Sequence, residues 1–297
     1  MSAAVKALAR QRRPERGGTS RRWGGTVLLL PFLAYFLLPL FWLIVSSTKT
    51  NGELFTSFGL WFTRDFNLFS NVRQLLAYDG GLYLRWLANT AVYSVSSAVG
   101  AALLATAGGY AFATFRFRGR AALFAVVLGA IMVPSTALVI PTYLLLSRVG
   151  LINTPFAVIL PSLVNPFGLY LMRVYAEQST AAEMLDAARV DGAGEFLIFR
   201  RVAFRLMAPG FVTVLLFSFV NTWNNYFLPL VMLSNPRYYP VTVGLATLNA
   251  QASAGGGAQV LFTLVITGAL IAILPLIAAF LFLQRYWQGG LAVGSFR

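Results

Sequence analysis

Hydrophobic residues in this chain form long uninterrupted runs that alternate with short charged segments. The first run, from Trp23 to Thr48, contains no charged side chain. A helix that crosses a bilayer needs about 20 apolar residues, whereas the apolar core of a cleaved signal peptide has about 7–15. The run is too long for a signal peptide, and no site of small residues suited to cleavage follows it. The pattern therefore predicts an uncleaved transmembrane helix over residues 24–46.

Five further runs meet the same length criterion. They predict transmembrane helices over 88–113, 121–145, 154–172, a part of the uncharged stretch 206–236, and 259–283. The chain is thus expected to be an all-α membrane protein with six transmembrane helices, built on one transmembrane domain of residues 23–297. Residues 1–22 are polar and rich in arginine, so we expect them to form a disordered tail.

The charged segments between the runs indicate the orientation. If the N-terminus is cytoplasmic, 17 of the 23 Lys and Arg residues fall on the inner side and the remaining 23 − 17 = 6 on the outer side. This bias agrees with the positive-inside rule. Six spans return the chain to its starting side, so both the N-terminus and the C-terminus are predicted to be cytoplasmic.

The composition supports a lipid environment. Hydrophobic residues make up 58% of the chain and charged residues 11%, with a mean hydropathy of +0.71. An average soluble domain has about 25% charged residues. The net charge of +14 is divided among short segments, so no continuous basic face is available for nucleic acid, and none is expected as a partner. The bilayer accounts for the same charge distribution.

The residues needed for most catalytic sites are missing from the sequence. It has no histidine and no cysteine, and neither of its two lysines lies in a phosphate-binding loop of the form G-x-x-x-x-G-K-[ST]. We therefore predict no catalytic residues, no metal ligands and no cofactor bound by this chain. If the protein uses ATP, another subunit must bind it.

All nine acidic residues lie outside the predicted spans. Charges inside a membrane cost about 2.5–3.5 kcal/mol, and ion-coupled and proton-coupled carriers keep them for that coupling. A self-sufficient ion-coupled secondary transporter is therefore disfavoured, although one that binds sodium through carbonyl and hydroxyl groups stays open. An external energy source, and so a partner, is the better expectation.

The inner segment 179–209 predicts two short helices joined by a glycine turn. Ser179 or Thr180 is a candidate N-cap for a helix ending at Val190, with Glu183 placed to complete a capping box from Thr180. Gly192 permits the positive φ of a C-cap, as does the neighbouring Gly194. A second helix is expected to begin near Glu195.

Apolar residues are spaced to share one face of each predicted helix. The two sets are Met184, Leu185 and Ala188 in the first helix, and Phe196, Phe199 and Val202 or Ala203 in the second. A helix pair of this kind serves either as a docking surface or as an amphipathic element lying on the membrane. The pattern alone leaves both interpretations open.

The same segment resembles the "EAA" loop of bacterial ABC importer permeases. Asp186, Ala187 and Ala188 take the place of the E-A-A triplet, Gly192 follows after three residues, and Val202 after nine more. The final Leu-Pro of the family pattern is replaced by Phe204 and Arg205. The spacing is kept, while the entry into the next helix departs from the family.

Further segments are similar to the carbohydrate-uptake branch of these permeases, in particular to the smaller membrane subunit of maltose importers. They are Trp86–Thr90, Gly109–Ala113, Ile131–Pro134, Ile140–Tyr143, Gly150–Thr154, Asn221–Tyr226 and Leu283–Leu291. An aspartate is usual in the family where Asn225 stands. The resemblance implies the type I importer permease fold and a non-catalytic subunit that moves a sugar into the cytoplasm of a bacterium across its inner membrane.

The resemblance also implies the partners and the residues that meet them. The partners are a second homologous permease, a cytoplasmic ATPase dimer that uses ATP and magnesium, an extracytoplasmic solute-binding protein and the sugar. The ATPase would contact the loop 179–209. The residues expected to couple to it are Glu183, Asp186, Ala187, Ala188, Gly192, Glu195 and Phe196.

Amide and aromatic side chains in the last third of the chain are candidates for the sugar path. Trp223, Asn224, Asn225 and Tyr226 combine the two groups that bind sugars, and Asn165 lies between two prolines of an earlier span. Anchoring at the membrane interface and hydrogen bonding between helices explain the same residues. Both interpretations stay open for the five residues.

Overall fold

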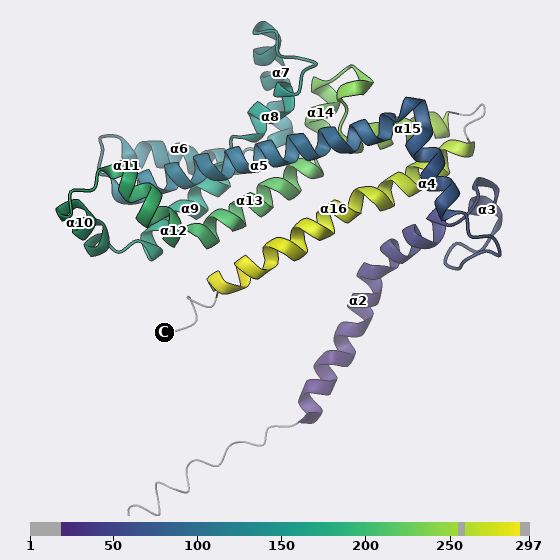
Figure 1. Ribbon diagram of the computed structural model, residues 1–297, viewed down its shortest axis with the longest axis horizontal. Coiled ribbons are helices and arrows are strands. Elements are labelled where there is room, and N and C mark those ends of the chain that lie inside the picture. Colours follow the sequence, from purple (N-terminus) through teal and green to yellow (C-terminus); the bar gives the residue numbers. More distant parts are fainter. Residues whose placement is uncertain (1–18, 255–258, 292–297) are drawn as a thin grey trace, which may run out of the picture.

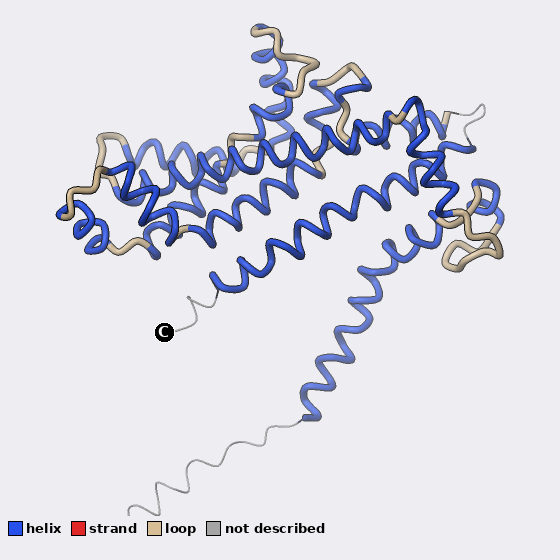
Figure 2. The backbone as a smooth tube through the Cα atoms, in the orientation of Figure 1, coloured by secondary structure: helices blue, strands red, loops and turns tan. Residues whose placement is uncertain are grey.

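A computed structural model describes residues 19–254 and 259–291, and the regular elements within these two ranges are helices (Figures 1 and 2). Most of the predicted N-terminal tail, residues 1–18, lies outside the described residues. Mixed 3-10 and π turns occur where helices bend or end. The helical character of the chain is as the hydrophobic pattern predicts.

Three helices form the centre of the molecule. They are α5 (Leu82–Thr114), α9 (Pro166–Ser179) and α13 (Ala208–Trp223), and α5 packs extensively on both of the others. The long helix α16 (Gln259–Leu291) lies along α13, and α2 (Thr19–Ser47) touches α16 before leaning away from the bundle (Figure 1). Apolar side chains of α2 from Leu29 to Ile44 are largely exposed, as expected for a surface in contact with lipid.

Small residues allow the central helices to approach closely. Ala101, Ala102 and Ala105 of α5 are buried, and Gly109 faces the backbone of α9. A Cβ atom built on Gly109 would lie 2.6 Å from the carbonyl carbon of Met172 and from the amide nitrogen of Arg173. Close contact through small residues is how membrane helices gain packing energy when lipid is as apolar as their side chains.

Within residues 19–254 and 259–291, four segments are long and apolar enough to cross a membrane, or up to six if each of two bent pairs counts as one span. Three of the four contain or overlap the predicted helices 24–46, 88–113 and 259–283. The fourth, Phe156–Ser179, unites α8 (Phe156–Ser162) and α9 and covers most of the predicted 154–172.

The predicted span over 121–145 is present but broken. The segment is divided into α6 (Arg120–Met132), the 3-10 turn η2 (Ser135–Leu138) and α7 (Val139–Arg148), with a bend of 102°. Pro134 is the cause, because it has no amide hydrogen and forces the preceding Val133 into an extended conformation (φ −81°, ψ 122°).

The stretch 206–236 is likewise not one helix. It is divided between α13 and the short α14 (Phe227–Met232), and α13 forms a membrane-length apolar segment only together with Glu195–Leu206, across a bend of 77°. The chain bends because Met207 ends the preceding helix and Pro209 begins the next in its first turn, where a missing amide hydrogen is tolerated.

The hydrophobic pattern also missed a buried helix, α15 (Val241–Ser253), which packs on α16 and α5. Its 13 residues are too few to cross a membrane, so the length criterion could not find it. Shorter elements lie at the same end of the molecule: α3 (Asn51–Thr56), α4 (Leu68–Ala77), and the 3-10 turns η1 (Tyr78–Gly80) and η4 (Pro236–Tyr238). We call this end, with α4 and α15, the α15 end.

Side chains of α5 bind the irregular backbone between α14 and α15. The Trp86 indole donates to the carbonyl of Pro236 (2.8 Å), and the Asn89 amide donates to those of Arg237 and Tyr239 (2.9 and 3.0 Å). Thr90 accepts from the backbone N–H of Val241 at 2.7 Å. These contacts give the segment Trp86–Thr90 a structural role, because backbone groups outside regular helices must find partners within the protein when water is excluded.

A second amide completes this arrangement from a different loop. Asn153 adopts a left-handed conformation (φ 59°), and its side-chain oxygen accepts from the backbone N–H groups of Ser234 and Asn235 at 3.0 and 2.9 Å. Asparagine is among the few residues that adopt this conformation at low cost. Two segments that sequence similarity alone had marked, Trp86–Thr90 and Gly150–Thr154, thus hold the same stretch of backbone.

The contact between α5 and α9 leads to a direct test. Gly109→Ala is expected to lower the melting temperature of the detergent-solubilised chain, because its Cβ would meet backbone atoms of α9 that cannot move independently. Overpacking of this kind costs about 1–3 kcal/mol. Gly129→Ala is the matched control, since no atom lies within 4 Å of the added Cβ on α6. Equal melting temperatures for the two variants would contradict the proposed close packing.

Candidate functional site

The loop between α9 and α13 is folded into two helices at the end of the bundle opposite the α15 end (Figure 1). The first is α10 (Ala182–Val190), and the second begins as α11 (Glu195–Ile198) and continues through a π turn, η3 (Phe199–Ala203), into α12 (Phe204–Leu206). The helix–glycine–helix pattern of the sequence is confirmed: the first helix ends at Val190 and the second begins at Glu195, as predicted.

The capping box expected at the start of α10 is wrong. Ala181 is the N-cap and supplies no side-chain hydrogen bond, whereas Thr180 is the C-cap of α9. The Thr180 hydroxyl donates to the carbonyl of Ala176 at 2.6 Å and so completes the last turn of α9 instead. Because α9 and α10 are separated by one extended residue pair, the threonine can serve only one of the two helices.

Gly192 ends α10 in the manner the sequence predicts. Its φ is +82°, and the backbone N–H groups of Gly192 and Ala193 donate to the carbonyls of Arg189 and Ala188, both at 3.0 Å. This pair of bonds is a Schellman motif, which satisfies the last carbonyls of a helix and reverses the chain. Gly194 has an ordinary φ of −69° and caps the start of α11, so only Gly192 needs the freedom of glycine.

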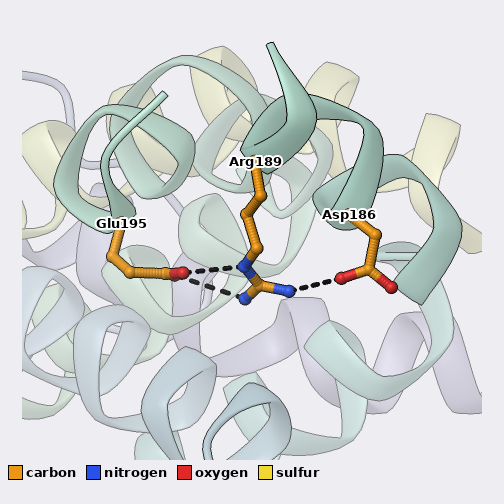
Figure 3. A network of polar contacts seen from close by, with 3 residues as sticks. All are labelled: Asp186, Arg189 and Glu195. Carbon is orange, nitrogen blue, oxygen red and sulfur yellow. Dashed lines mark hydrogen bonds and ion pairs between the residues drawn. The ribbon is translucent and has the colours of Figure 1, made fainter. Parts of the chain in front are cut away.

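Arg189 joins the two helices of the loop (Figure 3). Its guanidinium donates to Asp186 within α10 at 2.6 Å and to Glu195 at the start of α11 at 2.7 Å. The hydrogen bonds to Glu195 and then to Asp186 raise the pKa of Arg189 above its already high ordinary value. Arg189 therefore stays positively charged throughout the physiological range of pH and links α10 to the start of α11.

The apolar residues of the loop are divided between two surfaces. Leu185, Ile198 and Ala203 are buried in one core with Tyr110 of α5 and Met172 of α9. Leu185 and Ala188 pack on this core as expected, whereas Met184 is exposed, so the expected shared face is wrong for Met184 alone. The second expected face is divided in the same way, since Phe199, Val202 and Ala203 pack on the core while Phe196 is 75% exposed.

The outward surface of the loop combines apolar and acidic side chains. Val190 is 87% exposed, and Met184 and Phe196, six residues before and after it, are also exposed. Six of the seven predicted coupling residues are also exposed, and Ala188 is half-buried: the exposed six are Glu183, Asp186, Ala187, Gly192, Glu195 and Phe196. We call these exposed apolar residues (Met184, Val190 and Phe196), together with the acids Glu183, Asp186 and Glu195, the loop surface. No described part of the chain covers these exposed apolar residues, which marks a contact site.

Four of the five candidate sugar-path residues form side-chain hydrogen bonds, and three of them connect or cap helices, whereas Asn224 bonds only within α13. Asn165 donates to Ser218 (2.9 Å) and caps α9 by accepting from Gly168 (2.7 Å). Trp223 is buried and its indole donates to the carbonyl of Ala272 in α16. Asn225 accepts from the N–H of Leu228 at the start of α14 (3.3 Å). Helix connection explains these three residues.

The other two candidates are exposed, and the structure adds a third residue beside them. Asn224 and Tyr226 are exposed at the break between α13 and α14. Asn221 and the half-exposed Phe217 lie on the same side of α13 as Asn224, at spacings of three and four residues. Sequence analysis did not select Asn221, although its helical spacing from Asn224 was a usable signal.

No group of three or more His, Cys, Asp and Glu side chains that could hold a metal ion occurs among the described residues. A helical bundle with several membrane-length apolar segments, a folded loop at one end and exposed amides on a central helix defines a multi-pass membrane protein of the transporter permease class.

Comparison with known proteins identifies the family. Residues 98–289 match the family of binding-protein-dependent transport system inner membrane components, and the chain belongs to it. The arabinooligosaccharides transport system permease protein AraQ of Bacillus subtilis is 32% identical over 91% of this chain and 94% of its own length. The lactose transport system permease protein LacG of Rhizobium radiobacter is 28% identical over 89% and 91%.

A solved structure agrees with this assignment. A chain of a bacterial ABC transporter involved in the import of the acidic polysaccharide alginate is similar, with a TM-score of 0.78 and 25% sequence identity. The similarity covers 93% of the present chain and all of that chain. The fold is therefore that of an ABC importer permease.

The conformation of Gly192 gives a prediction that distinguishes backbone strain at a positive φ from a steric clash of an added side chain. Both glycines of the turn have no atom within 4 Å of an added Cβ, but only Gly192 has a positive φ. Gly192→Ala is expected to destabilise the turn by about 1–2 kcal/mol, whereas Gly194→Ala is expected to leave it unchanged. Hydrogen exchange of residues 182–198 measures the effect, and equal exchange in both variants would disprove the assigned strain.

Proposed function

We propose that this chain is a membrane subunit of an ATP-driven ABC importer that moves a sugar into the cytoplasm of a bacterium across its inner membrane. The observation that carries the proposal is the folded loop at one end of the bundle in a chain of this permease family. The names of its relatives, which are permeases for arabinooligosaccharides and lactose, support a sugar as the substrate class.

The orientation and the partners follow from the same proposal. Both termini and the loop are proposed to be cytoplasmic, which is supported by the distribution of Lys and Arg and is compatible with six spans if each bent pair counts as one. A separate ATPase dimer binds ATP and magnesium there, and a solute-binding protein delivers the sugar at the α15 end. A second homologous permease completes the path, and this chain has no catalytic role.

Coupling requires that a force on the loop reach the membrane helices. Leu185 and Ile198 of the loop share a buried core with Tyr110 of α5 and Met172 of α9, so the loop cannot move without them. The bonds from Arg189 to Asp186 and Glu195 keep α10 and α11 at a fixed angle. An ATPase that binds the loop surface would therefore rotate the bundle as a rigid body and produce alternating access.

The loop surface has the features of a docking site. Phe196 and Val190 are exposed apolar anchors, and Glu183, Asp186 and Glu195 are exposed acids of the same loop, the last two paired with Arg189. Interfaces gain most of their affinity from a few apolar or aromatic anchors, while charges at the rim orient the partner. A basic rim around an apolar groove is thus the expected complement on the ATPase.

The exposed side of α13 is the best candidate for the sugar path. Asn221 and Asn224 present amide groups there; the Asn224 amide donates to the carbonyl of Val220 at 3.0 Å, and facing lipid would be costly for the polar atoms that stay exposed. A water-filled path between this chain and the second permease removes that cost and offers hydrogen bonds to sugar hydroxyls. Tyr226, also exposed, supplies an aromatic surface for the sugar ring.

A self-sufficient ion-coupled transporter is the alternative function. No aspartate or glutamate lies inside the four single membrane-length segments except Glu177, which is in the last turn of α9 and pairs with Arg173 at 2.9 Å. Carboxylates used for ion coupling lie near the middle of the membrane instead. The location of the acids therefore favours the ABC importer.

Reconstitution with and without companion subunits tests the function and the docking site together. Uptake of a radiolabelled sugar into proteoliposomes is expected only with the ATPase, the second permease and ATP. Phe196→Ala should weaken ATPase binding at least about tenfold, or about 1.4 kcal/mol, because it removes an interface anchor. Phe69→Ala is the control, since Phe69 is 80% exposed at the opposite end.

Two results would contradict this reading. Uptake by the chain alone that depends on an ion gradient would support the secondary transporter. Equal ATPase affinity in the Phe196 and Phe69 variants would remove Phe196 from the docking site while leaving the transporter class intact.

The sugar path is tested by a pair of asparagine variants. Asn224→Ala is expected to raise the KM for sugar uptake with the melting temperature unchanged, because the only bond it loses is local and exposed. Asn165→Ala should lower the melting temperature instead, since it removes two bonds worth about 1 kcal/mol each. Uptake kinetics and thermal unfolding of both variants distinguish a role in the sugar path from a structural role. An unchanged KM for Asn224→Ala would exclude this residue from the path.

A further inference from the structure

A cavity of about 440 Å³ lies behind α10, where the ends of α5, α6 and α9 meet. Its volume is within the range of about 300–1,000 Å³ that small-molecule sites occupy. Neither the loop surface nor the exposed side of α13 includes it. The residues that line it and carry charge or hydroxyl groups are Thr114, Arg116, Arg120, Glu177, Thr180 and Arg189.

The lining contains three arginines and one carboxylate. Arg189 is paired with Asp186 and Glu195 outside the lining, so it adds no free positive charge to the cavity. Glu177 lies 2.9 Å from Arg173 and 3.8 Å from Arg120. One arginine of the lining is therefore left without a carboxylate, so the cavity is suited to an anion.

Arg116 is the cation that is left for such an anion. Arg120 is held by Glu177, and Arg189 is held by Asp186 and Glu195. Within the described part of the chain Arg116 has no ion pair, and it is exposed at the end of α5. A planar guanidinium with free donors suits the bidentate recognition of phosphate oxygens.

The segment that carries Arg116 also has the character of a membrane boundary. Phe115 and Phe117, on either side of it, are 36% and 40% exposed, and the Phe117 ring lies 5.6 Å from that of Phe112. The segment joins α5, which ends at Thr114, to α6, which starts at Arg120. Exposed aromatic residues beside a basic cavity favour a ligand with both a charged head and an apolar tail.

We propose that this cavity binds a phosphate group, carried by an anionic phospholipid of the surrounding leaflet, with Arg116 as the principal ligand and Arg120 as the supporting cation. Basic cavities between helices at the cytoplasmic side of membrane proteins are suited to lipid head groups. The orientation of the cavity toward the cytoplasm rests on the proposed function, whereas the binding of phosphate rests on the lining alone.

The experiment uses the full-length chain, with any companion subunits that copurify, in nanodiscs of phosphatidylcholine containing increasing fractions of phosphatidylglycerol. Native mass spectrometry counts the phosphatidylglycerol that stays bound. Arg116→Ala is expected to weaken binding about fivefold, in keeping with the contribution of one basic residue near a lipid surface. Arg118→Ala is the matched control, because Arg118 is exposed in the same segment but does not line the cavity.

A second arm replaces the lipid with inorganic phosphate in nanodiscs of phosphatidylcholine alone. Retention of phosphatidylglycerol that is lost in Arg116→Ala and kept in Arg118→Ala supports the lipid site. Equal losses in both variants would show general surface attraction and overturn the proposal, as would thermal stabilisation by inorganic phosphate at least equal to that by the lipid. No ATPase or sugar is needed, so the result is independent of the proposed transport function.

Discussion

The packing of the loop helices into the core of the bundle is the interaction on which the rest of the structure depends. Leu185, Ile198 and Ala203 are buried with residues of α5 and α9, so the loop is a structural part of the helix bundle. Burial of one such aliphatic side chain contributes about 1.5–3 kcal/mol, far more than a surface ion pair. Hydrophobic packing therefore attaches the loop to the helices, while Arg189 sets the angle between α10 and α11. The loop surface can then remain apolar and open, because the loop does not need it for its own stability.

The two ends of the bundle are stabilised by different interactions. At the loop end, hydrophobic side chains and a Schellman turn stabilise a short pair of helices in contact with water. At the α15 end, Trp86, Asn89, Thr90 and Asn153 donate to or accept from an irregular backbone that would otherwise lack partners. Apolar packing thus holds the first end together, whereas hydrogen bonds to the backbone keep a broken helix in place at the second.

The sequence could predict the parts of this fold that depend on the length of an apolar run or on the residues of one short segment. The apolar runs, the helix–glycine–helix loop and the left-handed Gly192 each depend on a local property of the chain, and each is present. A proline in an apolar run indicates a kink at Pro134 but not the 102° size of the bend, and α15 was missed because it is too short to span a membrane. Thr180 was assigned to the wrong helix because the sequence does not show which of two adjacent helix ends claims its hydroxyl. The same limit applies to the sugar-path candidates, since exposure separates Asn224 from Asn165 and only the fold determines exposure.

Exposed groups on the central helices indicate what the chain lacks when it is alone. Lipid accounts for the exposed apolar surface of α2, but not for the amides of Asn221 and Asn224. Nor does lipid alone account for Phe196, which the folded loop presents beyond the ends of the helices among acidic side chains. The exposed amides of α13 need water or polar protein as neighbours at membrane depth. The exposed Phe196 of the loop needs an apolar partner outside the membrane. Because both surfaces belong to helices that share a single buried core, an event at one can change the geometry of the other, which is the physical requirement for coupling.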